Sequence, residues 1–342
     1  MAFFNRAACF TDIHFGNKNN SKQHNRDCVD FVDWFIKQAQ EQNCETCIFL
    51  GDWHHHRASV NVSTLNYSVE NVAKLSKAFK QVYMITGNHD LYYREKRDYN
   101  SLPYAELFNN VHLINEQTLV QDDVALVPWL VGDEWTKVSK TKCRYMFGHF
   151  ELPYFKMNAM VEMPDHGQLN AEHLQGPEYV FTGHFHKRQN KGNVHYLGSP
   201  FPHNYADAWD DERGMMVLEW GGKPEYIDFA GPRYRTVSLS RLIDEPDEIL
   251  NSKTYCRATL DIAISYEEAS FIKETFSQQY GVREITLMPT KKEEHAQDWR
   301  VVDDIEVENV DQIVYNSLNA VDSDMIDKKL LVDIYNLSLI HI

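Results

Sequence analysis

The sequence predicts a layered α/β domain, followed by a small α+β unit and then by C-terminal helices. Up to about residue 230, short apolar runs alternate with stretches in which apolar residues recur at helical spacing. This alternation is typical of helices packed on sheets. From about residue 254 the pattern changes to one strand, one helix and one strand. A chain of 342 residues is long for a single core and fits one large domain with smaller appendages.

The large domain is expected to begin with a strand over residues 7–12 and a helix over residues 26–43. Apolar side chains share one face of that helix, namely those of Val29, Val32, Phe35 and Ile36. A strand over 47–52, a helix over 63–79 and a strand over 82–88 follow. Later short strands are expected at 124–129, 145–150, 179–185, 194–199 and 214–220. No internal repeat or low-complexity tract interrupts this order.

The small unit is predicted as an alternating strand at 254–264, a helix at 265–281 closed by Gly281, and a strand at 282–289. Two amphipathic helices are expected after it, the second with Ile326, Leu330 and Ile334 at helical spacing. Such a stripe belongs either to a core or to a partner-docking surface, and the sequence leaves both open. The predicted boundaries are 1–235 for the large domain, 250–290 for the small unit, 291–308 for a charged linker and 309–336 for the helices.

The last residues, "LSLIHI" (337–342), match one reading frame of a widely used transposon-type sequencing adapter. We expect them to be a cloning or assembly scar, with the natural C-terminus missing from this sequence. The alternative is a short apolar end to the last helix.

The composition is that of an ordinary soluble globular protein, with 43% hydrophobic and 25% charged residues. No apolar run approaches the ~18 residues of a membrane-spanning helix, and the N-terminus lacks the apolar core of a signal peptide. The 6 cysteines show no disulfide-framework spacing. Cys44 and Cys47 form a lone CxxC pair, which we interpret as buried thiols in a reducing cytoplasm rather than as a zinc or redox site.

The net charge of −16 is carried mostly by the part of the chain after residue 240. Such acidity argues against broad electrostatic adhesion to nucleic acid. It remains compatible with a local cationic site, particularly one created by bound metal ions.

Five apolar runs end in clusters of oxygen and nitrogen donors. Because the carboxyl ends of strands in an α/β sheet lie along one edge, where ligands bind, these clusters should converge on one crevice. Successive side chains on extended backbone point to opposite sides, so two donors separated by one residue can face the same point. The clusters are "TDIH" with Asp12 and His14, "GDWHHH" with Asp52 and His54–His56, "GNHD" with Asn88, His89 and Asp90, "GHFE" with His149, and "GHFH" with His184 and His186.

The donor types in these clusters indicate a metal site. Glycine precedes the donor at positions 51, 87, 148 and 183, where it allows a tight turn or a positive φ beside an ion. The donors are Asp, Asn and His without cysteine, which suits Mn²⁺, Fe²⁺ or Zn²⁺ and disfavours a thiolate zinc site. Seven donors with one shared carboxylate would serve two ions about 3.5–4 Å apart.

The motifs D-x-H, G-D, G-N-H-D, G-H and G-H-x-H, in that order over roughly residues 8–220, resemble those of the calcineurin-like metallophosphoesterases. The resemblance implies the layered metallophosphoesterase β-sandwich flanked by helices. Three further features are similar to the SbcD-type DNA repair nucleases, and more closely to their bacteriophage recombination endonuclease relatives. They are "DIHFG", the stretch "YLGSPFPHNYADAWDDERG" (196–214) and the small unit after residue 250.

The resemblance implies a role for each donor. One ion would be held by Asp12, His14 and His186, the second by Asn88, His149 and His184, with Asp52 bridging both. His89 matches the catalytic histidine beside the leaving group, Asp90 would orient its imidazole, and His55 matches a further functional histidine. We expect His54 and His56 to be ordinary loop histidines. The implied cofactors are two divalent metal ions, with Mn²⁺ as the expected metal.

Two basic loops directly follow donor clusters, at 92–100 and 187–193. They offer candidate contacts to a phosphate backbone, namely Arg94, Lys96, Arg97, Lys187 and Arg188. The alternative is that both are ordinary solvated loops. No base-reading motif is present, so cleavage should depend on DNA structure more than on base identity.

The resemblance also implies partners. These are DNA and an SMC-like ATPase of the SbcC type, whose coiled-coil root would be gripped by the helices at 309–336. A homodimer of this chain within a heterotetramer is implied by the resemblance alone. No membrane association is expected, and the implied location is the cytoplasm of a bacterial or phage-infected host cell.

The function that this reasoning favours is two-metal-dependent exonuclease or endonuclease activity on DNA, in recombination and repair. A first alternative is a metallophosphoesterase that acts on small phosphoesters or phosphoproteins, since its metal residues would be the same. A second is a non-catalytic scaffold of the ATPase complex, which would not need an intact set of donors together with His89.

Overall fold

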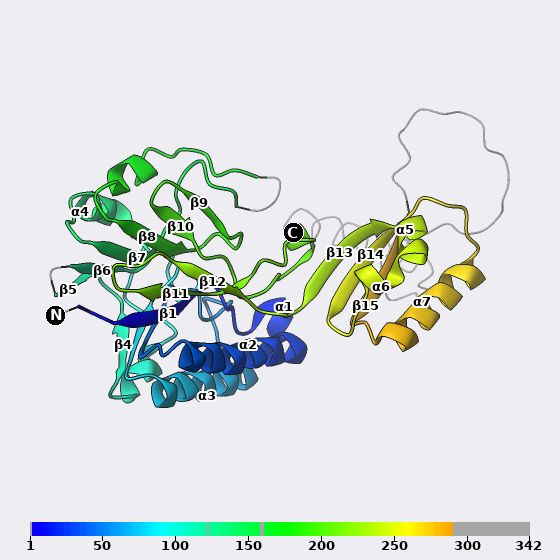
Figure 1. Cartoon of the computed structure of the whole chain (residues 1–342), viewed down its shortest axis with the longest axis horizontal. Helices are drawn as coiled ribbons and strands as arrows, with labels where there is room; N and C mark the ends of the chain where they lie inside the picture. Colours follow the sequence, from blue (N-terminus) through cyan, green and yellow to red (C-terminus); the bar gives the residue numbers. More distant parts are fainter. Residues whose placement is uncertain (1, 122, 158–160, 290–342) are drawn as a thin grey trace, which may run out of the picture. The chain divides into compact units, whose positions relative to one another are not determined.

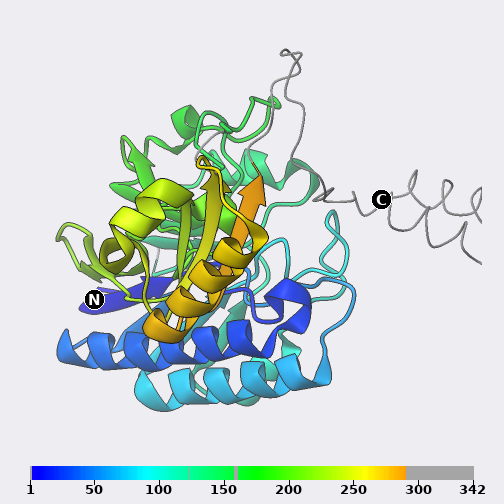
Figure 2. The same ribbon diagram turned by 90° about the vertical axis from the view of Figure 1, so that its right-hand side faces the viewer.

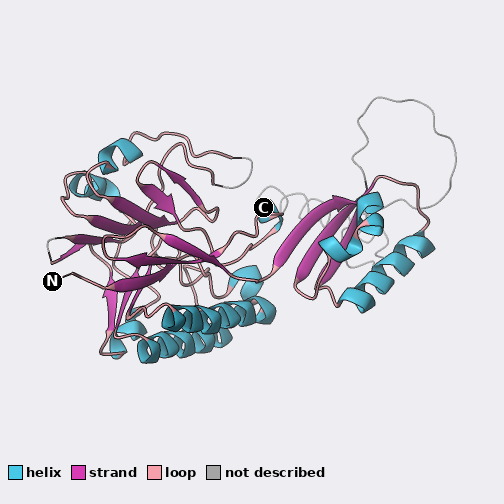
Figure 3. Ribbon diagram, in the orientation of Figure 1, coloured by secondary structure: helices cyan, strands magenta, loops and turns pink. Residues whose placement is uncertain are grey.

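The computed structural model describes residues 2–121, 123–157 and 161–289. Within them, two six-stranded sheets pack face to face, and a three-stranded sheet forms a smaller α+β part (Figures 1 and 3). This confirms the predicted layered α/β sandwich with a small second unit. The predicted linker at 291–308, the helices at 309–336 and the segment 337–342 lie outside the described residues.

The first sheet has the order β12–β11–β1–β2–β3–β4, with β1 to β4 parallel to one another and β11 and β12 antiparallel to their neighbours. In β1, Ala8 and Phe10 face the helical layer, whereas Ala7 and Cys9 face the second sheet. Because both faces are covered, this strand is apolar and buried from Ala7 to Phe10. The strands are β1 (Arg6–Phe10), β2 (Thr46–Phe49), β3 (Gln81–Ile85), β4 (Val111–Ile114), β11 (Gly214–Glu219) and β12 (Glu225–Asp228).

The second sheet has the order β5–β6–β7–β8–β10–β9, with four parallel central strands and antiparallel edges. On this sheet the rings of Phe147 and Phe181 stack on each other, with their centroids 5.3 Å apart. Both belong to the same buried cluster as Ile48 of the first sheet. A single hydrophobic core therefore holds the two sheets against each other. The strands are β5 (Thr118–Val120), β6 (Val124–Val127), β7 (Tyr145–His149), β8 (Tyr179–Gly183), β9 (Gln189–Lys191) and β10 (Val194–Tyr196).

Two long helices, α2 (Lys22–Glu41) and α3 (Val62–Ala78), lie side by side over the outer face of the first sheet (Figures 1 and 2). The Ser21 hydroxyl caps α2 by accepting from His24 N, so this helix begins earlier than residue 26, where the sequence predicted its start. Its apolar face, including Phe35, is buried in the core. The short helices are α1 (Asn17–Asn20), α4 (Trp135–Val138), η1 (Pro103–Leu107), η2 (Gly132–Glu134), η3 (Ala171–Leu174) and η4 (Tyr205–Asp207).

The small sheet contains three parallel strands, β13 (Arg233–Ser238), β14 (Thr254–Leu260) and β15 (Glu284–Pro289). The predicted helix is present as α7 (Tyr266–Tyr280); a capping box from Ser265 starts it, and Gly281 at φ 61° ends it. Two short helices, α5 (Leu239–Asp244) and α6 (Pro246–Ile249), connect β13 to β14. The sequence did not predict β13, which lies before residue 250, the predicted start of the small unit.

All six cysteines are free. Burial raises the pKa of the Cys44 thiol to about 11 and that of Cys47 well above its ordinary value. Both thiols are therefore buried, as the sequence analysis expected. None of the described helices is long and apolar enough to span a membrane.

Candidate metal centre

The loops after β1 and β2 run side by side and carry the two carboxylates of the site. Asp12 N donates to the carbonyl of Gly51 at 2.9 Å, and His14 N donates to that of Asp52 at 3.1 Å. Asp12, His14 and Asp52 have φ values of 52°, 53° and 63°, and His184 has 91°. A positive φ is uncommon outside glycine and is often retained where function requires it. Four of the predicted ligands therefore have the left-handed backbone conformation that residues other than glycine rarely adopt.

Glycine is required beside these loops for lack of space. Gly51 has φ +105°, and an added Cβ would lie 2.9 Å from Gly87 Cα and collide with the His149 ring. At Gly87 an added Cβ would collide with the Asp52 carboxylate. The predicted reason, a tight turn or positive φ, applies to Gly51, whereas Gly87 is needed because the ligand itself approaches the backbone.

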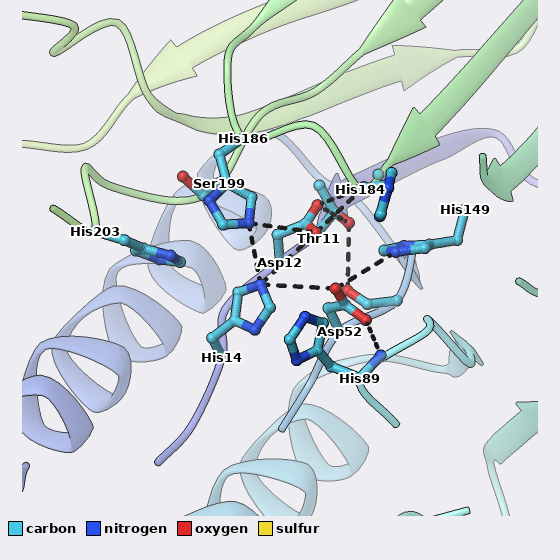
Figure 4. Close-up of polar contacts among 12 residues, drawn as sticks. Thr11, Asp12, His14, Asp52, His89, His149, His184, His186, Ser199 and His203 are labelled. Carbon is cyan, nitrogen blue, oxygen red and sulfur yellow. Dashed lines mark hydrogen bonds and ion pairs between the residues drawn. The ribbon is translucent and has the colours of Figure 1, made fainter. Parts of the chain in front are cut away.

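The two carboxylates are almost fully buried. Asp12 accepts from the Thr11 hydroxyl at 2.7 Å and from His184 N at 3.1–3.2 Å. Asp52 Oδ1 accepts from His89 N at 2.8 Å. Its other oxygen, Oδ2, lies 3.7 Å from His14 Nε2 and 3.5 Å from His149 Nε2. Asp52 therefore faces imidazoles on both sides, as Figure 4 shows.

One group of donors combines His14, His186, Asp12 and Asp52. The Nε2 atoms of His14 and His186 are 3.1 Å apart, and they lie 3.9 Å and 4.0 Å from Asp12 Oδ1. Ligands held at ~2.1 Å from one ion are separated by roughly 3.0–3.6 Å. These donors are thus already close to the spacing that a shared ion would impose.

The second group lies on the other side of Asp52. Asn88 Oδ1 is 3.1 Å from His149 Nε2 and 3.0 Å from His184 Nδ1. His149 Nδ1 lies 2.7 Å from the carbonyl of Leu50, which turns its Nε2 toward the other donors. The structure thus brings the seven predicted donors together, and Asp52 with His149 and His184 forms one of the candidate metal groups among the described residues.

The electrostatics of this cluster fit divalent cations. Burial, with the neighbouring Asp52 charge, raises the pKa of Asp12 to about 7. Burial lowers the pKa of His186 to about 4 and that of His14 well below its ordinary value. Neutral imidazoles are the form that binds metal. His149 differs: burial lowers its pKa, but the charge of Asp52 outweighs burial and raises it to about 9. Two buried carboxylates close together are unfavourable without positive charge between them. The residues present therefore suit a pair of divalent ions.

His89 lies beside the donors without belonging to the seven. Its Nδ1 is 2.6 Å from the carbonyl of His55, and its ring centroid is 4.9 Å from that of His14. The His55 ring stacks on it at 5.3 Å. The carbonyl of His55 thus fixes the orientation of the His89 imidazole and leaves its Nε2 available.

The structure corrects the role expected of Asp90. Its Oδ2 accepts from Asp52 N and Gly87 N, both at 2.9 Å, and its Oδ1 accepts from Trp53 N and His54 N, both at 3.0 Å. The fully buried Asp90 carboxylate is therefore occupied by four backbone amides and does not orient the His89 ring. It holds the loop that presents Asp52.

Asp90→Asn should consequently damage the site through the backbone. The asparagine NH₂ group would face amide donors where a carboxylate oxygen now accepts, a mismatch of about 1–3 kcal/mol in the free energy of unfolding. We also expect Mn²⁺ affinity to fall by ~10–100-fold, as for other residues that support metal ligands. Chemical denaturation and calorimetric metal titration measure both effects, with Asp98→Asn, an exposed aspartate nearby, as the control. Parent values in Asp90→Asn would refute this role.

The other two histidines of the triplet differ from each other. His54 is buried, with its ring nitrogens 2.7 Å from the Ser101 hydroxyl and 2.8 Å from that of Ser68. It points into the core, so it is not an exposed loop histidine. His56 packs its ring 4.9 Å from that of His55. His55 is the member of the triplet that contacts both His14 and His89, at ring distances of 5.4 Å and 5.3 Å.

Most of the predicted DNA-contacting cations are paired within the protein. Arg97 forms an ion pair with Glu134 and is largely buried. Arg188 pairs with Asp228 at 2.6 Å, and Lys187 with Asp210 at 3.0 Å. These three cations therefore have acidic partners distant in sequence, and their contact with phosphate stays a prediction.

Two of the five cations remain exposed near the site. The Arg94 side chain is 57% exposed, lies over the Trp129 ring at 5.9 Å and is 3.6 Å from Glu151 Oε2. Lys96 lies 5.8 Å from the Tyr93 ring centroid. Arg94, Trp129 and Glu151 also line a cavity of about 600 Å³ that reaches His149.

The sequence prediction missed two polar residues of this region. Glu151 Oε2 is 3.1 Å from His184 Nε2, so this carboxylate orients a predicted ligand; its signal was its place in the "GHFE" cluster. His203 packs its ring 4.9 Å from that of His186. His203 lies in the loop between β10 and β11. None of the five donor clusters lies in this loop, so the pattern of donors at strand ends did not indicate His203.

Comparison with known proteins decides the family. The model of the calcineurin-like phosphoesterase family matches residues 6–188, more than half of the chain, and this segment contains the seven donors. The chain belongs to the calcineurin-like phosphoesterase family. This confirms the predicted family and, with it, a metal-dependent phosphoesterase that uses divalent ions.

Among curated proteins, this family member is similar to "Exonuclease subunit 1" of Enterobacteria phage T4, with 27% identity over 216 residues. The alignment covers 61% of this chain and 62% of that relative, less than two thirds of its length.

Similar solved structures include the protein TT1561 from Thermus thermophilus, with 12% sequence identity and a TM-score of 0.41. The alignment covers 66% of this chain and 99% of that one. A nuclease, MPE, from Pseudomonas putida has 18% identity and a TM-score of 0.30, with coverage of 55% of this chain and 66% of that one.

Proposed function

We propose that this chain is a two-metal-dependent DNA nuclease that hydrolyses phosphodiester bonds in recombination and repair, together with an SMC-like ATPase. The observation that carries the proposal is the position of Asp52, whose Oδ2 lies within 3.7 Å of imidazole nitrogens from both donor groups. The similarity to an exonuclease subunit of phage T4 supports DNA as the substrate.

In this proposal Asp12, His14 and His186 hold one ion, Asn88, His149 and His184 hold the other, and Asp52 is shared. When bound, two divalent ions neutralise the charge of the phosphate and make water a competent nucleophile near neutral pH. Mn²⁺ is the metal we propose, because oxygen donors contribute to both groups.

His89 would act on the leaving oxygen. With Nδ1 held by the carbonyl of His55 at 2.6 Å, its Nε2 can donate a proton to the departing alkoxide or stabilise it by a hydrogen bond. His55, stacked on that ring at 5.3 Å, would limit its rotation. The carbonyl and the ring of His55 thus position the acid.

DNA would approach over the loop that carries Arg94 and Lys96. Tyr92, Tyr93 and Tyr99 of the same loop are 48%, 44% and 66% exposed and offer faces on which unpaired bases can stack. Exposed cations together with exposed aromatic rings fit a single-stranded end better than a small phosphoester.

Arg94→Ala should therefore raise the KM for DNA by roughly tenfold, or about 1.4 kcal/mol, and leave kcat nearly unchanged. It should also reduce the dependence of log KM on log salt by ~0.7, the contribution of one phosphate contact on single-stranded DNA. Steady-state cleavage at several salt concentrations tests this, with Lys37→Ala as control, since Lys37 is exposed on α2 and pairs with Glu41 of the same helix. An unchanged KM in Arg94→Ala would exclude this contact.

The proposal as a whole is tested on purified protein with Mn²⁺. Substrates are linear duplex DNA with open or blocked ends, single-stranded DNA, a cyclic nucleotide and a phosphopeptide. We expect hydrolysis of DNA, and the His89→Gln variant prepared in parallel should lack it. Hydrolysis confined to the cyclic nucleotide or the phosphopeptide would favour a metallophosphoesterase that acts on small phosphoesters or phosphoproteins. If no substrate is hydrolysed, the result would favour a non-catalytic scaffold.

The ATPase partner is proposed from the resemblance of this chain to the nuclease branch. The helices at 309–336 would dock on it and the small unit would contact DNA, with two copies of the nuclease in the complex. Sedimentation of the full chain with and without a cognate ATPase, beside a chain ending at residue 290, tests this assembly. Equal binding by both forms would exclude the helices as the docking element.

A further inference from the structure

A histidine outside the predicted ligand set, His203, is buried next to the first group of donors. It is 1% exposed, and neither Nδ1 nor Nε2 has a hydrogen-bond partner. A buried polar group without a partner is unfavourable, so such a group in a folded protein calls for an explanation. Within the described residues, neither ring nitrogen of His203 is used by a hydrogen bond, so either could bind an external ligand.

The position of this imidazole indicates what that ligand is. Its ring centroid lies 4.9 Å from that of His186 and 5.4 Å from that of His14. One ring nitrogen from each of the three histidines lies within 4.8 Å of the other two. Figure 4 places His203 on the side of His14 and His186, away from His149 and His184. His203 therefore neighbours one ion position only.

The loop that carries His203 is fixed to the loop that carries His186. Arg213 is fully buried; it donates to the carbonyl of His186 and, at 2.6 Å, to the Ser199 hydroxyl. It also pairs with Asp207 at 3.2 Å, whose other oxygen accepts from His203 N at 3.0 Å. One guanidinium thus connects both imidazole-bearing segments, which is the kind of support that metal ligands require.

We propose that His203 is a third imidazole ligand of the first ion, beside His14 and His186. This inference rests on the proposed two-ion function and extends it. The first ion would then have three nitrogen donors with Asp12 and Asp52, whereas the second has two with Asn88 and Asp52. Imidazole-rich sites favour Zn²⁺, Fe²⁺ and Co²⁺ over Mn²⁺. The two positions should therefore differ in metal preference.

The test is a Co²⁺ and Zn²⁺ titration of the full-length, metal-stripped protein, followed by visible absorption and calorimetry. The variants are His203→Leu and His203→Gln, and the control is His195→Leu, whose ring lies on β10 and contacts the Tyr226 hydroxyl. We expect two ions per parent chain. Both His203 variants should weaken one of them by at least ~10-fold, as loss of even a supporting residue does, and should change the Co²⁺ spectrum. His195→Leu should match the parent.

Each remaining outcome has one meaning. If both His203 variants bind two ions with parent affinity and spectrum, His203 is not a ligand and the inference is wrong. If the parent itself binds fewer than two ions, the proposed two-metal function fails instead. Thermal unfolding in EDTA identifies a packing role: a variant that is less stable without metal but keeps parent affinity and spectrum also refutes the inference.

Discussion

Asp52→Asn is expected to weaken both metal ions at once and to abolish nearly all metal-dependent hydrolysis. The Asp52 carboxylate contacts both donor groups, at 3.7 Å from His14 Nε2 and 3.5 Å from His149 Nε2. Loss of a residue that merely supports a metal ligand lowers affinity by ~10–100-fold, so loss of the shared carboxylate should exceed ~100-fold. Calorimetric titration with Mn²⁺ and turnover on DNA measure the two effects.

The same variant should fold normally without metal. Asparagine keeps the shape of the side chain and can still accept from His89 N, which now donates to Asp52 Oδ1 at 2.8 Å. It also removes one of two adjacent buried carboxylates, so the melting temperature in EDTA should equal or exceed that of the parent. Asp98→Asn is the surface control. Retention of two tightly bound ions by Asp52→Asn would contradict the shared-ligand assignment.

His89→Gln is expected to behave differently, with both ions retained and turnover reduced by ~10²–10⁴-fold, the usual contribution of a general acid. The backbone N–H of residue 89, which the substitution keeps, makes the bond to Asp52. Glutamine cannot replace an imidazole whose one nitrogen is held by the carbonyl of His55 and whose other nitrogen serves the leaving oxygen. Metal analysis and single-turnover cleavage distinguish binding from chemistry.

A metal role for His89 would give the opposite result. His14, His55 and His89 also form a candidate metal group, and an ion held there would be lost in His89→Gln together with turnover. His56→Gln is the matched control, because His56 neighbours His55 without contacting the donors. Parent turnover in His89→Gln would remove this residue from the mechanism altogether.

The sequence predicted the donors well because their positions follow from strand geometry. Each of the seven lies at or just after a buried strand, and parallel strands place such ends at one edge. His184 and His186 are separated by one residue, and both approach Asp12. The backbone N–H of His184 donates to the Asp12 carboxylate, and the His186 ring nitrogen Nε2 lies 4.0 Å from it. Patterning therefore predicted the strands around the site and the convergence of the clusters, whereas the order of the strands in each sheet was not predicted.

Side-chain partners distant in sequence were not predictable in the same way. Arg97 and Arg188 are neutralised by Glu134 and Asp228, and the sequence gives no measure of those distances. Asp90 was assigned to the ring beside it, whereas its oxygens bind amides of a loop that begins 38 residues earlier in the chain. The strand β13 has the mostly polar sequence RYRTVS and pairs with β14 along its whole length.

The central claim is that the carboxylate of Asp52 lies between two metal ions. Crystals of the full chain soaked in Mn²⁺ test it most directly, by anomalous diffraction at the manganese edge. We predict two peaks about 3.5–4 Å apart, one beside His14 and the other beside His149, with Asp52 between them. A single peak, or two peaks that do not share Asp52, would contradict the two-metal centre.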